Sequence, residues 1–290
     1  MAGEITTGSL TQSLPYVIAG SRLVREHEGV FMRTTDQTTL KTGTGLDWNE
    51  ISLSQFTAQT ITETTTLNNP QDIADTLFSI TPTMTGIHLK WTDRMKNRVD
   101  KGVAAKVGQG AQRAMNRRKD QDYLAMFETF TTTLGGTGTT MATGLISAAV
   151  ARIRSDTDEP SMDSIYAVLH GFQVKDIRDE ITAGVGTYPI PNGMTEQVFR
   201  SGFEGSIDGA EVYTGNNITI NATPDARGAV HAREAVVMVQ GRALKRYTRV
   251  VPDYGGGGEE LFLYDEYAYG ERSAGNWAYS VLTDATAPTS

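Results

Sequence analysis

The longest helical pattern of the chain follows Thr92. Apolar residues recur there in steps of four and then three, the spacing of one helix face: Met95, Val99, Val103, Val107, Ala111 and Ala114. Thr92 can cap the first turn, and Asp93 places an acid where the helix dipole favours one. We expect a long helix over 92–116, followed by a second helical piece from Asp120 to Phe130, with no proline to interrupt either.

A threonine-rich segment before this helix has the composition of β-structure. Twelve of the residues from Thr34 to Thr66 are threonine, whose branched side chain favours extended backbone and tolerates solvent. The sequence Lys41-Thr-Gly-Thr-Gly45 is typical of a turn, and we place the tip of a hairpin there. Residues 30–68 are therefore predicted to form a long, thin hairpin, which is marginal alone and needs a partner surface.

Three finer features are predicted around this hairpin. The apolar alternation changes phase between Trp48 and Ile51, which indicates a bulge or turn near Asn49–Glu50. Residues 72–77 can form a short helix. A strand is expected over 78–89, turning near its proline and glycine.

The rest of the chain alternates short helices and strands and then becomes mostly β. Helices are expected at 145–153 and 172–181, and the apolar run 165–169 predicts a buried strand. Gly255–Gly258 predicts a flexible connection between two strands. The other expected strands are 212–213, 218–220, 235–239, 247–251, 261–269 and 277–282.

Composition excludes several classes of protein. The 290 residues are 39% hydrophobic and 21% charged, so the chain can bury a core. No apolar run approaches the roughly 20 residues of a membrane helix, and the first residues lack a secretory signal, so we expect no membrane. There is no cysteine, which excludes disulfides, thiol nucleophiles and cysteine-ligated metals.

The net charge of −8 is unevenly distributed. Residues 92–119 hold nine basic and two acidic residues, a balance of +7 that leaves −15 for the rest of the chain. A solvated helix face explains such a pattern, and so does a surface matched to acidic neighbours. Weak contact with DNA phosphates also stays open, although the protein is acidic and its basic residues are not interleaved with stacking aromatics.

No motif predicts catalysis or cofactor binding. The four histidines lack the spacing of a zinc site, and His231 begins no ligand motif. The sequence Gly135-Gly-Thr-Gly138 lacks the lysine of a phosphate loop. Asp265 and Glu266 are adjacent on an expected strand and point to opposite faces, so they form no catalytic pair. We expect no enzyme and no cofactor.

The order of these segments resembles a known family. The residues that carry the resemblance are TPTMTGIHLKWTDRM before the helix, RKDQDYLAMFETF at its end, SIYAVLHGFQVKDIRDEI, and the closing ELFLYDEYAYGERSAGNWAYSVLTDAT. Together they are similar to the major capsid protein of tailed bacteriophages with the Hong Kong 97-type fold. The resemblance covers nearly the whole chain and rests on order and pattern, since none of these segments is a catalytic signature.

The resemblance implies an α+β fold with named parts. These are an N-arm (1–29), an extended β-hairpin called the E-loop (30–75), a peripheral domain (76–144) with a spine helix (92–131), an axial domain (145–240), and C-terminal strands that return to the peripheral domain (241–290).

The resemblance also implies partners and a location. Subunits would form hexamers and pentamers of an icosahedral head in the virion, assembled in the host cytoplasm with scaffolding, portal and decoration proteins around double-stranded DNA. The candidate contacts between subunits are Lys41, Trp48, Arg94, Arg98, Arg113, Arg117 and Arg118. The alternative shell is an encapsulin-like compartment that holds protein cargo.

Overall fold

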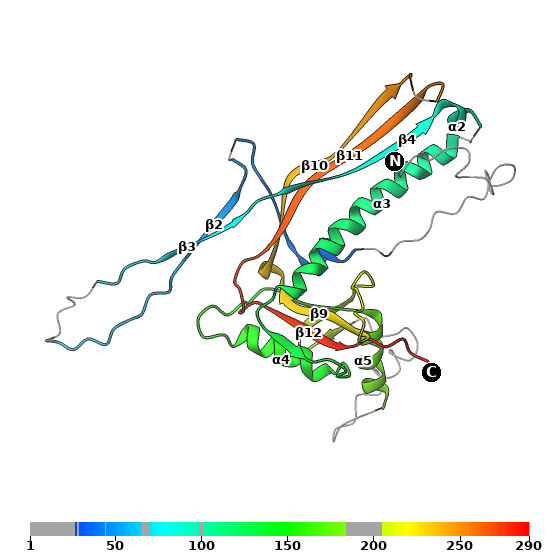
Figure 1. The fold of residues 1–290 in the computed structure, drawn as a ribbon. Coiled ribbons are helices and arrows are strands. Elements are labelled where there is room, and N and C mark those ends of the chain that lie inside the picture. Colours follow the sequence, from blue (N-terminus) through cyan, green and yellow to red (C-terminus); the bar gives the residue numbers. More distant parts are fainter. Residues whose placement is uncertain are drawn as a thin grey trace.

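Two β-sheets, a long helix and a projecting hairpin make up the molecule (Figure 1). The computed structural model describes residues 27, 29–43, 45–64, 70–98, 101–183, 205–253 and 255–289. Helices and strands are mixed along the chain, as the α+β prediction requires. Most of the predicted N-arm, residues 1–26 and 28, lies outside this range.

The first sheet has four strands in the order β1-β10-β11-β4. Its bounds are β1 (Asp36–Thr39), β10 (Val236–Val251), β11 (Gly258–Glu271) and β4 (Thr83–Thr92). Only β1 pairs in parallel. The two strands predicted at 235–239 and 247–251 are one strand, β10, whose register with β11 shifts between Gln240 and Lys245. The sequence did not predict one continuous strand because the middle of β10 is polar. A strand with both faces exposed does not need alternating apolar and polar residues.

The predicted long helix lies along one face of this sheet (Figure 1). It comprises α2 (Asp93–Arg98), α3 (Lys101–Ala125) and the 3₁₀ turn η2 (Met126–Glu128). The predicted N-cap is confirmed, since the Met95 N–H donates to Thr92 Oγ1 at 3.2 Å. The predicted gap between the two helical pieces is wrong, because α3 runs through residues 116–120 without a break. Three of the five residues there are Arg or Lys, which are good helix formers, and none is Gly or Pro.

The second sheet has six strands in the order β5-β12-β9-β6-β8-β7. Helices α4 (Thr143–Arg154) and α5 (Gly171–Ala183) flank it, close to the predicted 145–153 and 172–181 (Figure 1). The strands are β5 (Thr133–Gly135), β6 (Ile165–Leu169), β7 (Ser206–Ile207), β8 (Ala210–Thr214), β9 (Asp225–Ala232) and β12 (Ala278–Asp284).

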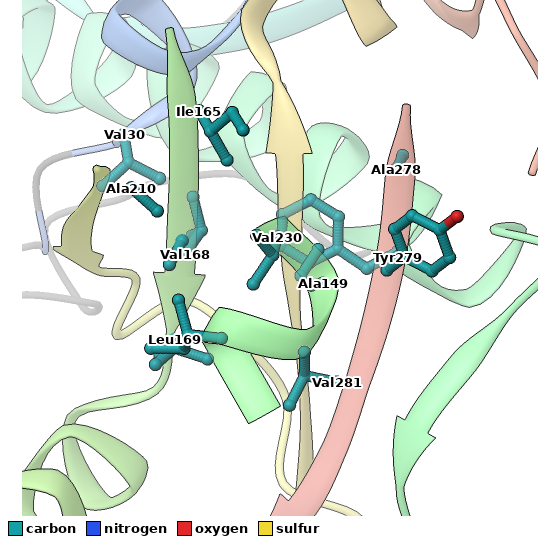
Figure 2. Close-up of a cluster of buried hydrophobic side chains, with 14 of the residues drawn as sticks. Val30, Ala149, Ile165, Val168, Leu169, Ala210, Val230, Ala278, Tyr279 and Val281 are labelled. Atoms are coloured by element: carbon teal, nitrogen blue, oxygen red, sulfur yellow. The ribbon is translucent and has the colours of Figure 1, made fainter. Parts of the chain in front are cut away.

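Strand β6 is the centre of the main core, with all five residues buried between β9 and β8, as predicted. Figure 2 shows Val168 and Leu169 beside Val230 of β9, with Ala149 of α4 and Val281 of β12 in the same cluster. Strand β9 was not predicted, because its Asp-Ala-Arg-Gly-Ala-Val-His-Ala sequence shows no period of two. Small residues suit it, since a Cβ at Gly228 would lie 2.6 Å from the Val168 carbonyl oxygen.

The projecting hairpin consists of β2 (Trp48–Leu53) and β3 (Asp75–Ile80). Its register is continuous from Trp48↔Ile80 to Leu53↔Asp75, so the predicted bulge near Asn49–Glu50 is wrong. The predicted helix at 72–77 is also wrong, since β3 begins at Asp75. The phase change in the sequence has another cause: Trp48 faces the sheets, whereas Ile51 and Leu53 are exposed.

Two further expectations need correction. The turn at 41–45 is not the tip of the hairpin, because β1 pairs with β10 and the turn connects β1 to β2 at the hairpin's root. Within residues 241–290, β11 lies in the sheet beside α3, whereas β12 is hydrogen-bonded in the six-stranded sheet. The C-terminal strands therefore do not all return to the domain of the long helix.

Candidate assembly surfaces

The root of the hairpin is fixed by Arg272. Its guanidinium pairs with Asp36 at 2.7 Å and with Glu50 at 2.8 Å, and donates to the Glu234 carbonyl at 3.1 Å. Arg272, which directly follows β11, thus holds β1, β2 and the 3₁₀ turn η3 (Arg233–Ala235) together. The planar guanidinium presents several N–H donors, which suits it to bind several acceptors at once.

Trp48 belongs to this root. Its ring meets Phe78 edge to face at 6.1 Å, and the Arg272 guanidinium lies 5.9 Å from the ring centre. Trp48 and Phe78 pack on a small core of Ile80, Val237 and Val239. Trp48, which the sequence predicted as an inter-subunit contact, is half-buried and anchors the hairpin within its own chain.

Beyond the root, the hairpin exposes apolar side chains. Ile51 of β2 lies opposite Leu77 of β3, and they are 60% and 64% exposed. Leu53, Phe56, Ile61 and Ile73 are also exposed. The Gln55 side chain donates to the Asp158 carbonyl, a contact that covers none of these apolar groups. Several exposed large apolar residues on one slender element mark an interaction surface.

The predicted basic contacts on the helix lie in different environments. Arg94, Arg113 and Arg117 are exposed, while the side chain of Arg98 lies outside the described part. Arg118 is exposed but pairs with Asp122 at 3.0 Å, and Asp122 also accepts the Tyr267 hydroxyl at 2.7 Å. Arg118 therefore helps fix α3 on β11. Lys41 is exposed at the hairpin's root.

The last of the nine basic residues in 92–119, Lys119, points inward. Its ammonium pairs with Asp265 of β11 at 2.7 Å, with side-chain exposures of 11% and 2%. Gln240 of β10 donates to the other Asp265 oxygen at 2.5 Å. The interpretation of this lysine as part of an outward basic surface is wrong, because the pair locks α3 to the place where β10 changes register.

A second inward carboxylate joins three parts of the chain. Asp120 Oδ1 accepts the N–H of Val30 at 2.8 Å and of Phe31 at 3.3 Å, at the start of α1 (Phe31–Thr34). Its Oδ2 accepts the Asn217 amide at 2.7 Å. Burial raises the pKa of Asp120, while these three hydrogen bonds oppose the rise. Sequence reasoning missed this junction, since partners about 90 residues apart leave no local signal.

The buried His231 has a structural role. Its Nδ1 donates to the Ala232 carbonyl at 2.9 Å, so its Nε2 accepts from the Tyr123 hydroxyl at 2.6 Å. Thr34 of α1 in turn donates to the Tyr123 oxygen at 2.8 Å. Burial lowers the pKa of His231 to about 4, so the ring is neutral at pH 7. The chain of bonds links α1, α3 and β9.

These contacts fix the surfaces of the hairpin, the long helix and the two sheets relative to one another. No group of three or more histidine or acidic side chains suited to a metal occurs within the described residues. Among the helices that the structure describes, none combines the length and apolarity needed to cross a bilayer.

Solved structures with the same fold include bacteriophage capsids. The capsid of the cyanophage P-SCSP1u superposes with a TM-score of 0.71 at 14% identity, over 97% of this chain and 96% of that chain. The capsid of Helicobacter pylori bacteriophage KHP30 gives 0.70 at 13%, over 98% and 100%. A chain of Mycobacterium phage Che8 gives 0.67 at 14%, over 90% and 94%.

No family model matches the sequence, and no curated protein matches it either. At identities this low, the superpositions establish the fold and nothing beyond it. The chain has the Hong Kong 97-type fold of tailed-phage capsid proteins along nearly its full length, which confirms the fold predicted from the order of its segments.

Proposed function

We propose that this chain is the major capsid protein of a tailed bacteriophage. In this proposal its copies form the hexamers and pentamers of an icosahedral head, assembled in the host cytoplasm and present in the virion. The observation that carries the proposal is the projecting hairpin, whose exposed Ile51, Leu53 and Leu77 have no covering surface within the described chain. The shared fold of the phage capsids supports it.

Physical reasoning leads from this hairpin to assembly. An isolated two-stranded hairpin is marginal in water, so this one gains order when its apolar face is covered. Burying that face contributes roughly 25 cal/mol for each Å² removed from water. A contact between the hairpin of one copy and a different surface of the next is heterologous, and such contacts close into rings when the rotation permits.

The parts implied by the resemblance keep their roles in this proposal. The four-stranded sheet with α3 serves as the peripheral domain, and the six-stranded sheet with α4 and α5 serves as the axial domain. The exposed Arg94, Arg113 and Arg117 stay candidate contacts between subunits. A scaffolding protein, a portal and decoration proteins are the proposed partners.

The proposed content of the shell is double-stranded DNA held without sequence preference. The net charge of −8 favours a container that does not grip phosphates tightly. An encapsulin-like compartment is not favoured, since the structural neighbours named above come from phages.

Hairpin truncation tests the proposal. In the variant, residues 54–74 are replaced by Asn-Gly, which keeps β2, β3 and the anchored root. Sedimentation velocity should show megadalton particles for the full chain and a single subunit species for the variant, with unchanged circular dichroism. A full chain that sediments only as a small discrete oligomer would contradict the proposal.

A further inference from the structure

A histidine caps the N-terminus of α5. The Nδ1 atom of His170 accepts the backbone N–H of Phe172 at 3.2 Å, and the backbone N–H of His170 donates to the Gln173 side chain at 2.8 Å. This reciprocal arrangement is a capping box, with a histidine at the position where serine or threonine is usual. Nδ1 can accept a hydrogen bond only while it carries no proton, so the cap requires the neutral ring.

This cap is buried and bonded to the six-stranded sheet. His170 is 8% exposed, and Gln173 is fully buried. The Gln173 amide donates to the Ala226 carbonyl of β9 at 2.9 Å and to the Thr283 hydroxyl of β12 at 2.7 Å. A change in the charge of His170 therefore acts at the place where α5 joins the sheet.

The surroundings of His170 disfavour a positive charge on its ring. The first turn of α5 holds no acidic residue to offset a cation at the positive end of the helix dipole. The Phe172 ring packs edge to face on the imidazole at 4.7 Å, and Asn216 of the loop after β8 lies beside Gly171, so both neighbours are uncharged. Burial, and then the charge of His27 in the segment before α1, lower the pKa of His170.

We propose that His170 is an acid-sensitive cap, and that protonation of its ring opens the first turn of α5, with His27 as the second charge that drives the opening. The protonated ring loses the bond from Phe172, places a cation at the helix N-terminus and repels the other imidazole. Opening exposes the ring to water and takes up a proton, so the open turn gains population as the pH falls below about 6.5. This device belongs to the subunit and does not depend on the proposed shell.

Two other buried groups titrate in acid and differ from this cap in sign or in range. Burial raises the pKa of Asp120, so its protonation in acid favours the folded state and cannot open the turn. Burial lowers the pKa of His231 to about 4, so His231 does destabilise the subunit in acid, but it acts on the whole fold. Hydrogen exchange in β6, at the centre of the main core, measures that global contribution.

Hydrogen exchange of the full chain between pH 7.5 and pH 5, read by mass spectrometry, tests the cap in whatever assembly the chain forms. After correction for the intrinsic pH dependence of exchange, amides 171–175 should accelerate by at least about threefold more than those of β6. In His170→Asn the side-chain oxygen caps the helix without titrating, so this extra acceleration should disappear. Acceleration of 171–175 only in step with β6, or an equal extra acceleration in His170→Asn, overturns the inference.

Two further variants separate the cap from the second charge. His170→Ala removes the acceptor at every pH, so amides 171–175 should exchange rapidly already at pH 7.5. His27→Gln should reduce the extra acceleration in acid, because without His27 the closed ring accepts a proton more readily. The matched control is His88→Gln, at a half-exposed histidine of the other sheet, which should respond like the unmodified chain. An undiminished response in His27→Gln would overturn the role given to His27.

Discussion

The N–H of Val30 donates to the Asp120 carboxylate at 2.8 Å, across 90 residues of sequence. The other oxygen of Asp120 holds Asn217 in the loop after β8. The N-terminal part of the described chain, the long helix and the six-stranded sheet therefore meet at one buried side chain. Gly29 allows this meeting, because a Cβ there would lie 2.9 Å from Asp120.

Removing this carboxylate should destabilise the subunit. Asp120→Ala leaves two buried N–H groups and the half-buried Asn217 amide without their acceptor, and we expect a loss of at least about 2 kcal/mol in the free energy of unfolding. Urea denaturation of the subunit measures it. The neighbouring exposed change Gln121→Ala should stay within about 0.5 kcal/mol. Equal midpoints for the two variants would show that the junction contributes little.

The buried pair of Lys119 and Asp265 should behave as a coupled unit. Lys119→Met leaves the 2%-exposed Asp265 without its cation, which should cost about 3–5 kcal/mol. Adding Asp265→Leu removes the stranded charge, so the double variant should be more stable than Lys119→Met alone. A double-mutant cycle by denaturation measures this, and strictly additive effects would refute the coupling.

Stability should fall in acid because of His231. Burial lowers the pKa of His231 from 6.5 to about 4. Between these two pH values the imidazole is protonated in the unfolded chain and neutral in the folded chain, so unfolding takes up a proton. Stability is complete above about pH 6.5 and declines by up to about 3 kcal/mol as the pH falls to 4. His231→Gln should be less stable at pH 7 but flatter between pH 4 and 6.5. The same slope in both proteins would assign the acid sensitivity to other groups.

Loss of the Arg272 side chain alone should loosen the hairpin. Arg272→Met removes the ion pairs to Asp36 and Glu50, both partly exposed, so global stability should fall by only about 1–2 kcal/mol. Hydrogen exchange should accelerate in β2 and β3 and stay unchanged in β6. Arg233→Met, at an exposed arginine of η3, is the control. Unchanged exchange in the hairpin would mean that packing of Trp48 alone holds the root.

The sequence predicts best the elements whose pattern is set by their own burial. Strand β6 is apolar throughout because both of its faces are covered, and α5 shows helical spacing because one side packs inward. Thr92 caps α2 through its own side chain, a local interaction. In such elements, the residues that determine the local structure lie within a few positions of one another in the sequence.

Long-range pairing accounts for what the sequence does not predict. Nothing local indicates that β1 pairs with β10, so the turn at 41–45 was placed at the wrong end of the hairpin. Lys119 has the residue type of a surface contact, yet Asp265 from a distant strand turns it inward. The phase change at Ile51 reflects an apolar face that the described part of the chain does not cover.

The most direct test of the account is negative-stain electron microscopy of the purified full chain, with the 54–74 replacement on a parallel grid. The account predicts closed, hollow icosahedral particles of uniform diameter for the full chain and no closed particles for the variant. Closed shells formed by the variant would show that the hairpin is dispensable for assembly. A full chain that stays monomeric would contradict the central claim that this protein builds a shell.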